Sequence, residues 1–232
     1  MKFDKPLIPG RLIERYKRFL ADVELEDGTV ITAHCANPGS MLGLKDAGSR
    51  VWLSKSDNPK RKLAYSWELL ELDDAMIGIN TAHPNRIVEE AILAEQIAEL
   101  ADYEHLRREV KYGKNSRIDL LLQDEAKPDC YVEVKNVHLL RQPGLAEFPD
   151  SVTKRGAKHL AELSDMVREG HRAVMLYLVQ RTDADRFALA GDIDPAYAEA
   201  FAQATEQGVE AIVYLCDIST SEITLSRPLP FA

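Results

Sequence analysis

The chain contains few cysteines, and the three that it has lie far apart. Cys35, Cys130 and Cys216 form no C-x-x-C pair, and no histidine cluster accompanies them at metal-ligand spacing. An odd, scattered set of this kind excludes a disulfide framework and a structural zinc site. We therefore expect three reduced cysteines that act as small apolar side chains in a cytoplasmic protein.

Long apolar runs are also missing from the sequence. No stretch reaches the roughly 20 apolar residues that a helix needs to cross a bilayer. The start of the chain, Met1 to Pro6, lacks the apolar core of a signal peptide. These absences predict a protein that stays in the cytosol and has no membrane partner.

The third scarcity is positive charge. The sequence has 29 Lys and Arg against 38 Asp and Glu, a formal net charge of −9. This balance excludes a broadly basic coat, so any contact with nucleic acid must come from local patches. The sequence also offers no helix-turn-helix or other major-groove reader. With 45% hydrophobic and 29% charged residues in 232, it predicts one large globular domain or two smaller ones.

Short strands separated by turn residues fill residues 11–79. Residues 19–25 and 29–35 alternate in polarity around the turn Asp27-Gly28, which is typical of a β-hairpin. Further short strands are expected at 50–53, 64–70 and 76–79. About five short strands over this length predict a small barrel, with the OB-fold as the natural candidate.

The pattern changes between Asn80 and Pro84, and helices then alternate with strands. The expected elements are a helix over 85–100, a β-hairpin, a helix over 151–169 closed by Gly170, a strand at 173–179, a helix from Asp194-Pro195 to near Gly208, and strands at 211–215 and 222–225. This order predicts a mixed α/β sheet with right-handed crossovers. We therefore expect an OB-fold-like domain over 1–80 and an α/β domain over 81–232.

The hairpin of the second half carries the residues that point most directly to chemistry. Its arms are residues 117–122 and 130–135, and the polar segment 123–129 between them is expected to be the loop. Asp119 and Glu133 have an even sum, so a register with a five-residue loop places them opposite each other on one face. Lys135 lies two residues beyond Glu133 and therefore shares that face.

Two opposed carboxylates repel unless a cation lies between them. A divalent ion with hard oxygen ligands would remove the conflict, and a lysine beside it could orient water or stabilise developing charge. The alternative is a solvated hairpin face with a Glu–Lys salt bridge.

The helix expected after Pro84 carries Glu89 and Glu90 near its start. On a helical wheel Glu90 lies at the flank of the apolar stripe, whereas Glu89 points further toward solvent. We therefore predict Glu90 as a further metal ligand. The alternative is that both acids simply suit the positive end of the helix dipole.

Two basic segments are candidates for contact with nucleic acid. Arg155, Lys158 and His159 share a face near the start of the 151–169 helix, where free backbone N–H groups suit a phosphate. The alternative there is a solvated basic face, and spacing gives His159 no support as a general base. Gly156, on the inward side, predicts close approach by another element.

The second basic segment lies in the first half and sits beside aromatic rings. Lys60, Arg61 and Lys62 precede Tyr65 and Trp67, a combination typical of sites that bind single strands or flipped-out bases. A further cationic stretch comprises Arg11, Arg15, Lys17 and Arg18. Burial of the aromatics in the barrel core is the alternative.

The ordered motifs of the whole chain resemble the sugar fermentation stimulation protein A family. The motifs are Arg18-Phe19-Leu20-Ala21-Asp22-Val23, Asn37-Pro38-Gly39-Ser40-Met41, Lys60-Arg61-Lys62-Leu63-Ala64-Tyr65, Pro84-Asn85-Arg86, Asp119, Glu133-Val134-Lys135-Asn136, Thr153-Lys154-Arg155-Gly156 and Asp194-Pro195. The resemblance implies an OB-fold followed by a restriction-endonuclease-like domain of the PD-(D/E)-x-K kind. It also implies DNA binding, and in enteric bacteria the family is associated with regulation of maltose metabolism.

The resemblance implies particular roles for the hairpin residues. Asp119 and Glu133 would hold magnesium or manganese with Glu90 as the helix-borne acid, and Lys135 would assist the attacking water. The sequence departs from the motif at Ile118, where the proline that names it would stand.

Two functions follow from these observations. The first is a magnesium- or manganese-dependent nuclease acting on single- or double-stranded DNA, and the alternative is a non-catalytic DNA-binding regulator of sugar metabolism. The intact set of Asp119, Glu133 and Lys135 favours catalysis, and the sequence leaves a homodimer open. The residues predicted to bind nucleic acid are Arg15, Arg18, Lys60, Arg61, Lys62, Tyr65, Arg155 and Lys158.

Overall fold

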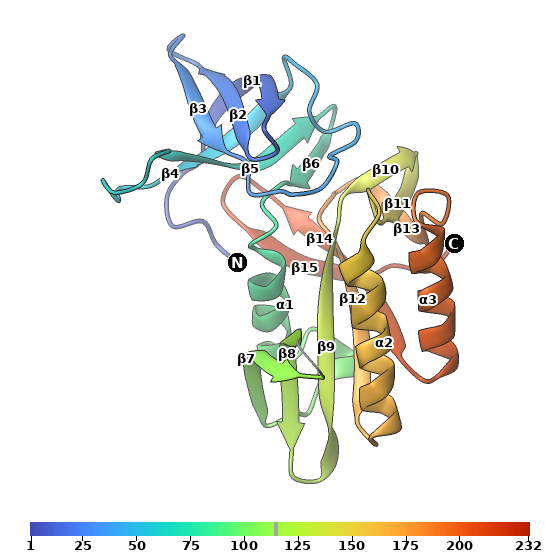
Figure 1. The fold of residues 1–232 in the computed structure, drawn as a ribbon. Coiled ribbons are helices and arrows are strands. Elements are labelled where there is room, and N and C mark those ends of the chain that lie inside the picture. Colours follow the sequence, from blue (N-terminus) through green and yellow to red (C-terminus); the bar gives the residue numbers. More distant parts are fainter. Residues whose placement is uncertain (114–115) are drawn as a thin grey trace.

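The first half of the chain forms a β-barrel (Figure 1). The computed structural model describes residues 1–113 and 116–232. The strands of this half are β1 (Ile8–Tyr16), β2 (Leu20–Leu25), β3 (Val30–His34), β4 (Arg50–Lys55), β5 (Tyr65–Leu72) and β6 (Ala75–Gly78). Their order is β3-β2-β1-β4-β5-β6, and a parallel pairing of β3 with β5 closes the first five strands into a barrel. The expected OB-fold is confirmed.

Alternating side chains fill the barrel. Leu12, Val23, Leu53 and Trp67 are among its fully buried residues, and the residues between them along the strands are mostly polar or charged. This alternation is the period-two pattern that predicted the strands. The sequence did not single out β1, because its alternating charges were interpreted as a cationic stretch.

The second half is a mixed α/β fold. Its elements are α1 (Pro84–Leu93), a 3₁₀ turn (Ala98–Leu100), β7 (His105–Tyr112), β8 (Ser116–Asp124), β9 (Lys127–Val137), β10 (Leu139–Gln142), β11 (Gly144–Phe148), α2 (Lys154–Arg168), β12 (Arg172–Val179), β13 (Ala184–Leu189), α3 (Pro195–Glu206), β14 (Glu210–Ile218) and β15 (Ile223–Pro228). The main sheet has the order β15-β14-β12-β9-β8-β7, and its three central strands run parallel.

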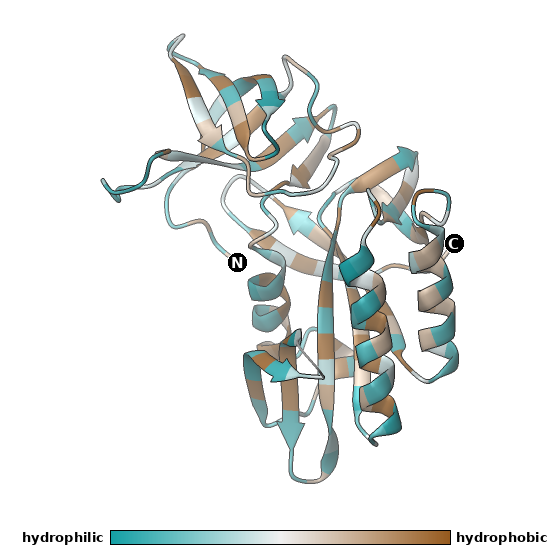
Figure 2. Ribbon diagram, in the orientation of Figure 1, coloured by the Kyte–Doolittle hydropathy of each residue, from teal (hydrophilic) through white to brown (hydrophobic). Residues whose placement is uncertain are grey.

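Helices cover both faces of this sheet. Apolar residues of α1 pack with one set of strand side chains, and those of α2 and α3 pack with the other. Figure 2 shows the result, with hydrophobic residues on the central strands and hydrophilic residues on the outer sides of the helices. The predicted mixed sheet and the two helices of the crossovers are confirmed. Among the described residues, no helix is both long enough and apolar enough to cross a membrane.

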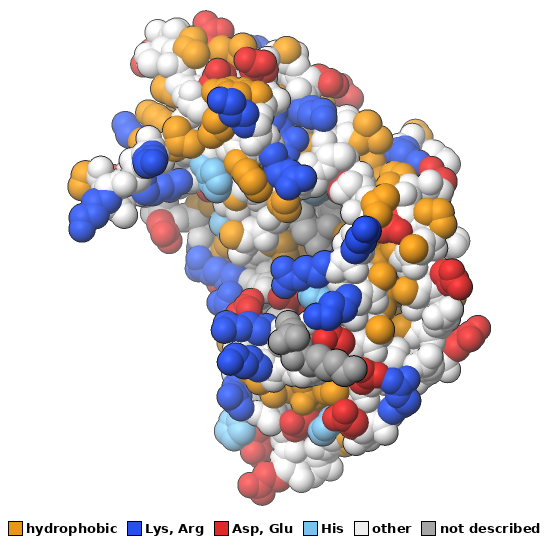
Figure 3. Space-filling view, in the orientation of Figure 1, with side chains coloured by type: hydrophobic (Ala, Val, Ile, Leu, Met, Phe, Trp, Pro, Cys, Tyr) orange, Lys and Arg blue, Asp and Glu red, His pale blue; other side chains and the backbone are white. Residues whose placement is uncertain are grey.

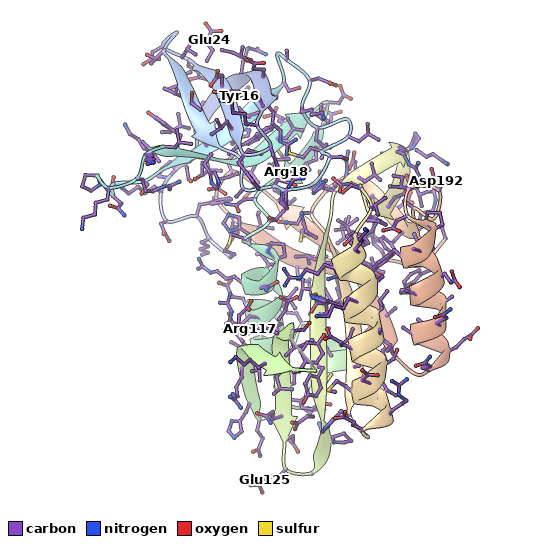
Figure 4. All side chains as sticks on the ribbon, in the orientation of Figure 1. Tyr16, Arg18, Glu24, Arg117, Glu125 and Asp192 are labelled. Carbon is purple, nitrogen blue, oxygen red and sulfur yellow. The ribbon has the colours of Figure 1, made fainter. Side chains whose placement is uncertain are left out.

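Two elements differ from the sequence-based expectation. The helix expected over 85–100 ends at Leu93, because Glu95 adopts a left-handed backbone (φ 56°) that reverses the chain. After this reversal Ile97 reaches the core from outside the helix. The expected loop over 123–129 is also wrong, since β8 and β9 continue to a tight turn at Glu125-Ala126. Figure 4 shows Glu125 at the far tip of this hairpin.

Some strands were not predicted at all. The small sheet β10-β11-β13 and the edge strand β7 lack the continuous apolar pattern of the central strands. In β7 most side chains are exposed, which is typical of a sheet edge.

Candidate metal site and nucleic-acid interface

The predicted register of the hairpin is confirmed beside the two acidic residues. The strands β8 and β9 pair through Leu120 and Val132, the residues next to Asp119 and Glu133. Next to this pair, the side chain of Asp119 bonds to the neighbouring strand, since its Oδ2 accepts a hydrogen bond of 2.8 Å from the backbone N–H of Val134 in β9. Antiparallel pairing therefore brings both carboxylates to one place.

Asp119 is held from two sides. In addition to the contact with Val134, its Oδ1 accepts a hydrogen bond of 2.8 Å from the amide of Asn85, in the first turn of α1. Burial and the negative charge of Glu133 raise the pKa of Asp119 above its usual value. Burial is the larger of these two effects, and the nearby charge of Glu133 adds to it.

Glu133 uses its two oxygens differently. Its side chain is 3% exposed, and Oε1 accepts from Lys135 Nζ at 2.6 Å and from Nδ1 of His159 on α2. Oε2 is buried and has no hydrogen-bond partner among the described residues. Burial alone would raise the pKa of Glu133, but His159 and Lys135 outweigh it and hold the pKa below its usual value. The carboxylate therefore stays charged with one oxygen unused.

Sequence reasoning did not assign the contributions of Asn85 and His159. Asn85 belongs to a motif that carried the resemblance, but an asparagine in a first helical turn gave no sign of its partner. His159 was recognised only as part of a basic face. Its neighbour Arg155 donates from Nε to His159 Nε2 at 3.2 Å, so α2 delivers two linked residues to the site.

The structure does not bring Glu90 together with Asp119 and Glu133. The Glu90 carboxylate pairs with the N-terminal ammonium of Met1 at 2.7 Å and with Arg86 at 2.8 Å, and the side chain is 43% exposed. The physical reason is helical geometry, because Asn85 turns its own face of α1 toward Asp119. The acid one turn along that face is Glu89, which pairs with Arg108 at 3.1 Å.

The remaining acids still suit a hard divalent ion. In the described part of the chain, no three or more His, Cys, Asp or Glu residues are grouped so as to hold a metal. Mg²⁺, however, needs only one or two carboxylates when water and substrate phosphates complete its octahedron. The unpartnered Oε2 of Glu133, beside a carboxylate with a raised pKa, fits that requirement.

The basic residues predicted on the barrel have different surroundings. Arg15 is half-buried and donates to the carbonyls of Asn37 and Gly39, so it supports that loop. Arg61 donates to Ser66 Oγ at 2.9 Å, whereas Lys60 and Lys62 are exposed.

The aromatics beside this segment separate into two environments. Trp67 is fully buried and donates its indole N–H to Leu69, so core packing accounts for it. Tyr65 is half-buried, and Lys55 Nζ lies 5.4 Å from its ring centroid, which is cation–π geometry. Only Tyr65 is left with an accessible ring.

A cleft of about 350 Å³ lies between the barrel and α1. Its lining includes the basic residues Lys2, Lys5, Lys55, Arg61 and Arg86 and the acidic residues Asp4, Asp57 and Glu68. The lining residue Arg86 pairs with Glu90, so the cleft lies beside the face of α1 that carries Glu90. Figure 3 shows basic side chains gathered below the barrel, over α1, β7 and the start of α2.

A second cleft, of about 400 Å³, lies where the barrel meets the start of α2. Its lining includes Arg18 from the barrel, Asn136 from the end of β9 and His138 directly after β9. Figure 4 shows Arg18 on the side of the barrel that faces the α/β half. The exposed residues Arg155 and Lys158 lie in the first turns of α2, with Lys158 Nζ 3.2 Å from Ser116 Oγ.

The fold and site together define a class of protein: an OB-fold barrel joined to a mixed α/β domain with an acidic site. Family models match both parts, one described as "SfsA N-terminal OB domain" over residues 13–79 and one as "Sugar fermentation stimulation protein RE domain" over residues 82–222. The chain belongs to the sugar fermentation stimulation protein family.

Relatives match over almost the whole length. A sugar fermentation stimulation protein homolog of Rhodospirillum centenum is 62% identical, with 99% of this chain and 98% of the relative covered. Another, from Paramagnetospirillum magneticum, is 60% identical over 99% and 97%. The solved structure of Pyrococcus furiosus SfsA in complex with Ca²⁺ aligns with a TM-score of 0.88 at 25% identity, covering 100% of this chain and 98% of that one.

Proposed function

We propose that this protein is a magnesium- or manganese-dependent nuclease that hydrolyses phosphodiester bonds in DNA. The observation that carries the proposal is the buried Oε2 of Glu133, which has no hydrogen-bond partner in the described part of the chain and lies near Asp119, a carboxyl with a raised pKa. A buried carboxylate oxygen without a hydrogen-bond partner is costly, and a divalent cation is a group that would satisfy it. The Ca²⁺ complex of the Pyrococcus furiosus relative supports a divalent site in this family.

Each residue of the site has a distinct task in this proposal. Asp119 and Glu133 would hold the metal ion, which supplies charge neutralisation and lowers the pKa of water. Asn85 and the N–H of Val134 orient Asp119. Lys135, 14% exposed beside Glu133, places a positive charge where a phosphate would become more negative.

DNA would reach this site along a cationic surface formed by the exposed residues Lys60, Arg61, Lys62, Arg155 and Lys158. Local patches must supply the attraction, because the net charge of the chain is −9. The start of α2 contacts the acidic site through His159 and carries the exposed Arg155 and Lys158, so a strand bound there would pass Glu133. The cleft between the barrel and α1 would hold a further part of the strand. Lys60, Lys62 and Tyr65 extend this surface onto the barrel, where a ring can stack on a base.

The alternative is a non-catalytic DNA-binding regulator of sugar metabolism. One observation favours it: both oxygens of Asp119 already accept hydrogen bonds, from Asn85 and from Val134. A carboxylate with two protein donors can be stable without a metal ion. The name of the family agrees with either function.

The deciding experiment incubates the purified full-length protein with single- and double-stranded DNA in the presence of magnesium, manganese or EDTA. The nuclease proposal expects cleavage that needs the metal and disappears in Asp119→Ala. If wild type and Asp119→Ala bind DNA equally and neither cleaves it, the nuclease proposal fails and the regulator stands.

We also infer a domain boundary near residue 80 and a cytoplasmic location. The change from barrel strands to α1 at Pro84 supports the boundary. In the described part of the chain Cys35, Cys130 and Cys216 are free and buried, as in a reducing compartment.

A further inference from the structure

His159 and Arg155 contact the acidic site from α2, and neither residue belongs to the Asp–Glu–Lys motif. His159 is 4% exposed, and its Nδ1 faces Oε1 of Glu133. Its other ring nitrogen, Nε2, lies 3.2 Å from Nε of Arg155 in hydrogen-bonding geometry. The imidazole is therefore bound at both nitrogens, on one side by an acceptor and on the other by a donor.

This pair of contacts fixes the tautomer of the ring. A guanidinium can only donate, so the Nε2 atom that receives its N–H carries no proton. The single ring proton of the neutral imidazole then resides on Nδ1 and is donated to Glu133. The carboxylate of Glu133, which accepts from Nδ1, and Arg155, which donates to Nε2, therefore favour the same tautomer.

The same contacts determine how Glu133 presents its oxygens. Lys135 and His159 both donate to Oε1, so this oxygen is fixed by contacts within the protein. Oε2 is left buried and unpartnered among the described residues. Partners that lock a metal-binding side chain in one orientation commonly matter as much as the ligands themselves.

We propose that Arg155 and His159 form a positioning pair that locks the Glu133 carboxylate, with the imidazole in its Nδ1–H tautomer, so that Oε2 is directed to a divalent metal ion. The proposal rests on the metal site of the proposed function. Arg155 thereby acts through His159 and Glu133, in addition to any contact with phosphate.

The first test measures the tautomer and needs neither metal nor DNA. Nitrogen-15 NMR of the histidine rings at pH 8, with His159→Gln used to assign the resonance, should show the proton of His159 on Nδ1. In Arg155→Met the population of the Nε2–H form should rise, because only the contact with Glu133 then favours Nδ1–H, whereas Lys154→Met, an exposed neighbour in the same turn, should leave the tautomer unchanged. A wild-type proton on Nε2 would overturn the proposal.

The second test measures Mn²⁺ binding by calorimetry without substrate. His159→Leu should weaken Mn²⁺ binding by at least about tenfold, the size expected for loss of such a partner. His159→Gln keeps one donor and one acceptor and should recover most of the affinity, and thermal unfolding checks that both variants fold. Equal Mn²⁺ affinity in wild type and a folded His159→Leu contradicts the proposal. If the wild type binds no Mn²⁺, the proposed metal function fails, and the tautomer measurement still decides whether the pair exists.

Discussion

At the scale of single residues, the acidic site is asymmetric. Both oxygens of Asp119 accept hydrogen bonds, whereas Glu133 accepts two donors at Oε1 and has no partner at Oε2 among the described residues. Burial and the charge of Glu133 raise the pKa of Asp119, whereas at Glu133 His159 and Lys135 outweigh burial and lower the pKa. We therefore regard Glu133 as the charged anchor of the site.

Glu133→Gln tests that anchor. The substitution keeps the shape of the side chain but removes its charge, and it places a neutral amide against Lys135. We expect Mn²⁺ affinity to fall by about one hundredfold, since the ion would lose a charged oxygen ligand. Calorimetry with Mn²⁺ measures this, and Glu125→Gln at the tip of the hairpin is the matched control. Unchanged affinity in folded Glu133→Gln would mean that Glu133 is not a ligand.

At the scale of elements, α1 decides which side chains face the metal site. Asn85 in its first turn contacts Asp119, whereas Glu90 pairs with Arg86 and the N-terminal ammonium. The sequence pattern predicted an amphipathic helix here but could not give its rotation about the axis. Glu90 was predicted as a ligand because it flanks the apolar stripe. In the structure this flank of α1 faces the N-terminus of the chain.

Two substitutions on α1 test this orientation. Asn85→Ala removes a donor from Asp119 and should weaken Mn²⁺ binding by roughly three- to tenfold, as loss of one ordinary hydrogen bond of about 0.5–1.5 kcal/mol predicts. Glu90→Gln should leave Mn²⁺ binding unchanged, because its partners lie elsewhere. Both affinities can be measured by calorimetry. A larger loss in Glu90→Gln than in Asn85→Ala would restore Glu90 as the helix-borne ligand.

The helix α2 shows what local sequence does predict. Its N-cap, Thr153, accepts from the backbone N–H of Gly156, and Gly156 lets Tyr197 of α3 approach so closely that a Cβ would clash. The sequence indicated both the helix and the close approach. It did not indicate that His159 meets Glu133, because that contact depends on how α2 packs across β9 rather than on spacing within α2.

At the scale of the whole molecule, the Asn37–Met41 motif joins the two halves. Asp150, beyond β11, accepts from the backbone N–H of Met41 at 3.1 Å, and Ser40 Oγ donates to the Asp150 carbonyl at 2.7 Å. A Cβ on Gly39 would clash with the Asp150 carboxylate, so glycine is needed for this approach. The Asn37–Met41 motif, one of those that carried the family resemblance, is therefore explained by the contact between the two halves rather than by catalysis.

The junction predicts a pH-dependent stability. Burial raises the pKa of Asp150, but the nearby His138 and the N–H of Met41 outweigh it and hold the pKa at about 2. Because the folded-state pKa lies below the unfolded value of about 3.9, Asp150 stabilises the protein above pH 4, and this is lost as the pH falls toward 2.

Urea unfolding of wild type and Asp150→Asn measures this contribution. The wild type should be more stable by roughly 2 kcal/mol at pH 6, and the difference should shrink steadily below pH 4. A difference in unfolding free energy that stays constant between pH 6 and pH 2.5 would show that the charge of Asp150 does not tie the halves together.

The cationic surface spans both halves, so its prediction also belongs to the whole molecule. Replacing Lys60, Arg61 and Lys62 together by glutamine should weaken DNA binding and reduce its dependence on salt, by about 0.7–0.9 in the logarithmic slope for each phosphate that the variant no longer neutralises. Fluorescence anisotropy with labelled DNA at several salt concentrations measures both. As a control, Lys127 and Arg168, far along the sequence in the second half, are replaced by glutamine. An equal salt slope in the triple variant and wild type would remove this segment from the interface.

The central claim is that Asp119 and Glu133 hold a divalent metal ion for DNA cleavage. The most direct measurement follows cleavage of labelled single- and double-stranded DNA by the full-length protein and by Asp119→Ala, with manganese, magnesium or EDTA. The account predicts cleavage by the wild type with manganese or magnesium, none with EDTA, and a loss of at least about one hundredfold in Asp119→Ala. Cleavage that persists equally in Asp119→Ala, or a wild type that binds DNA and never cleaves it with either metal, would contradict the account.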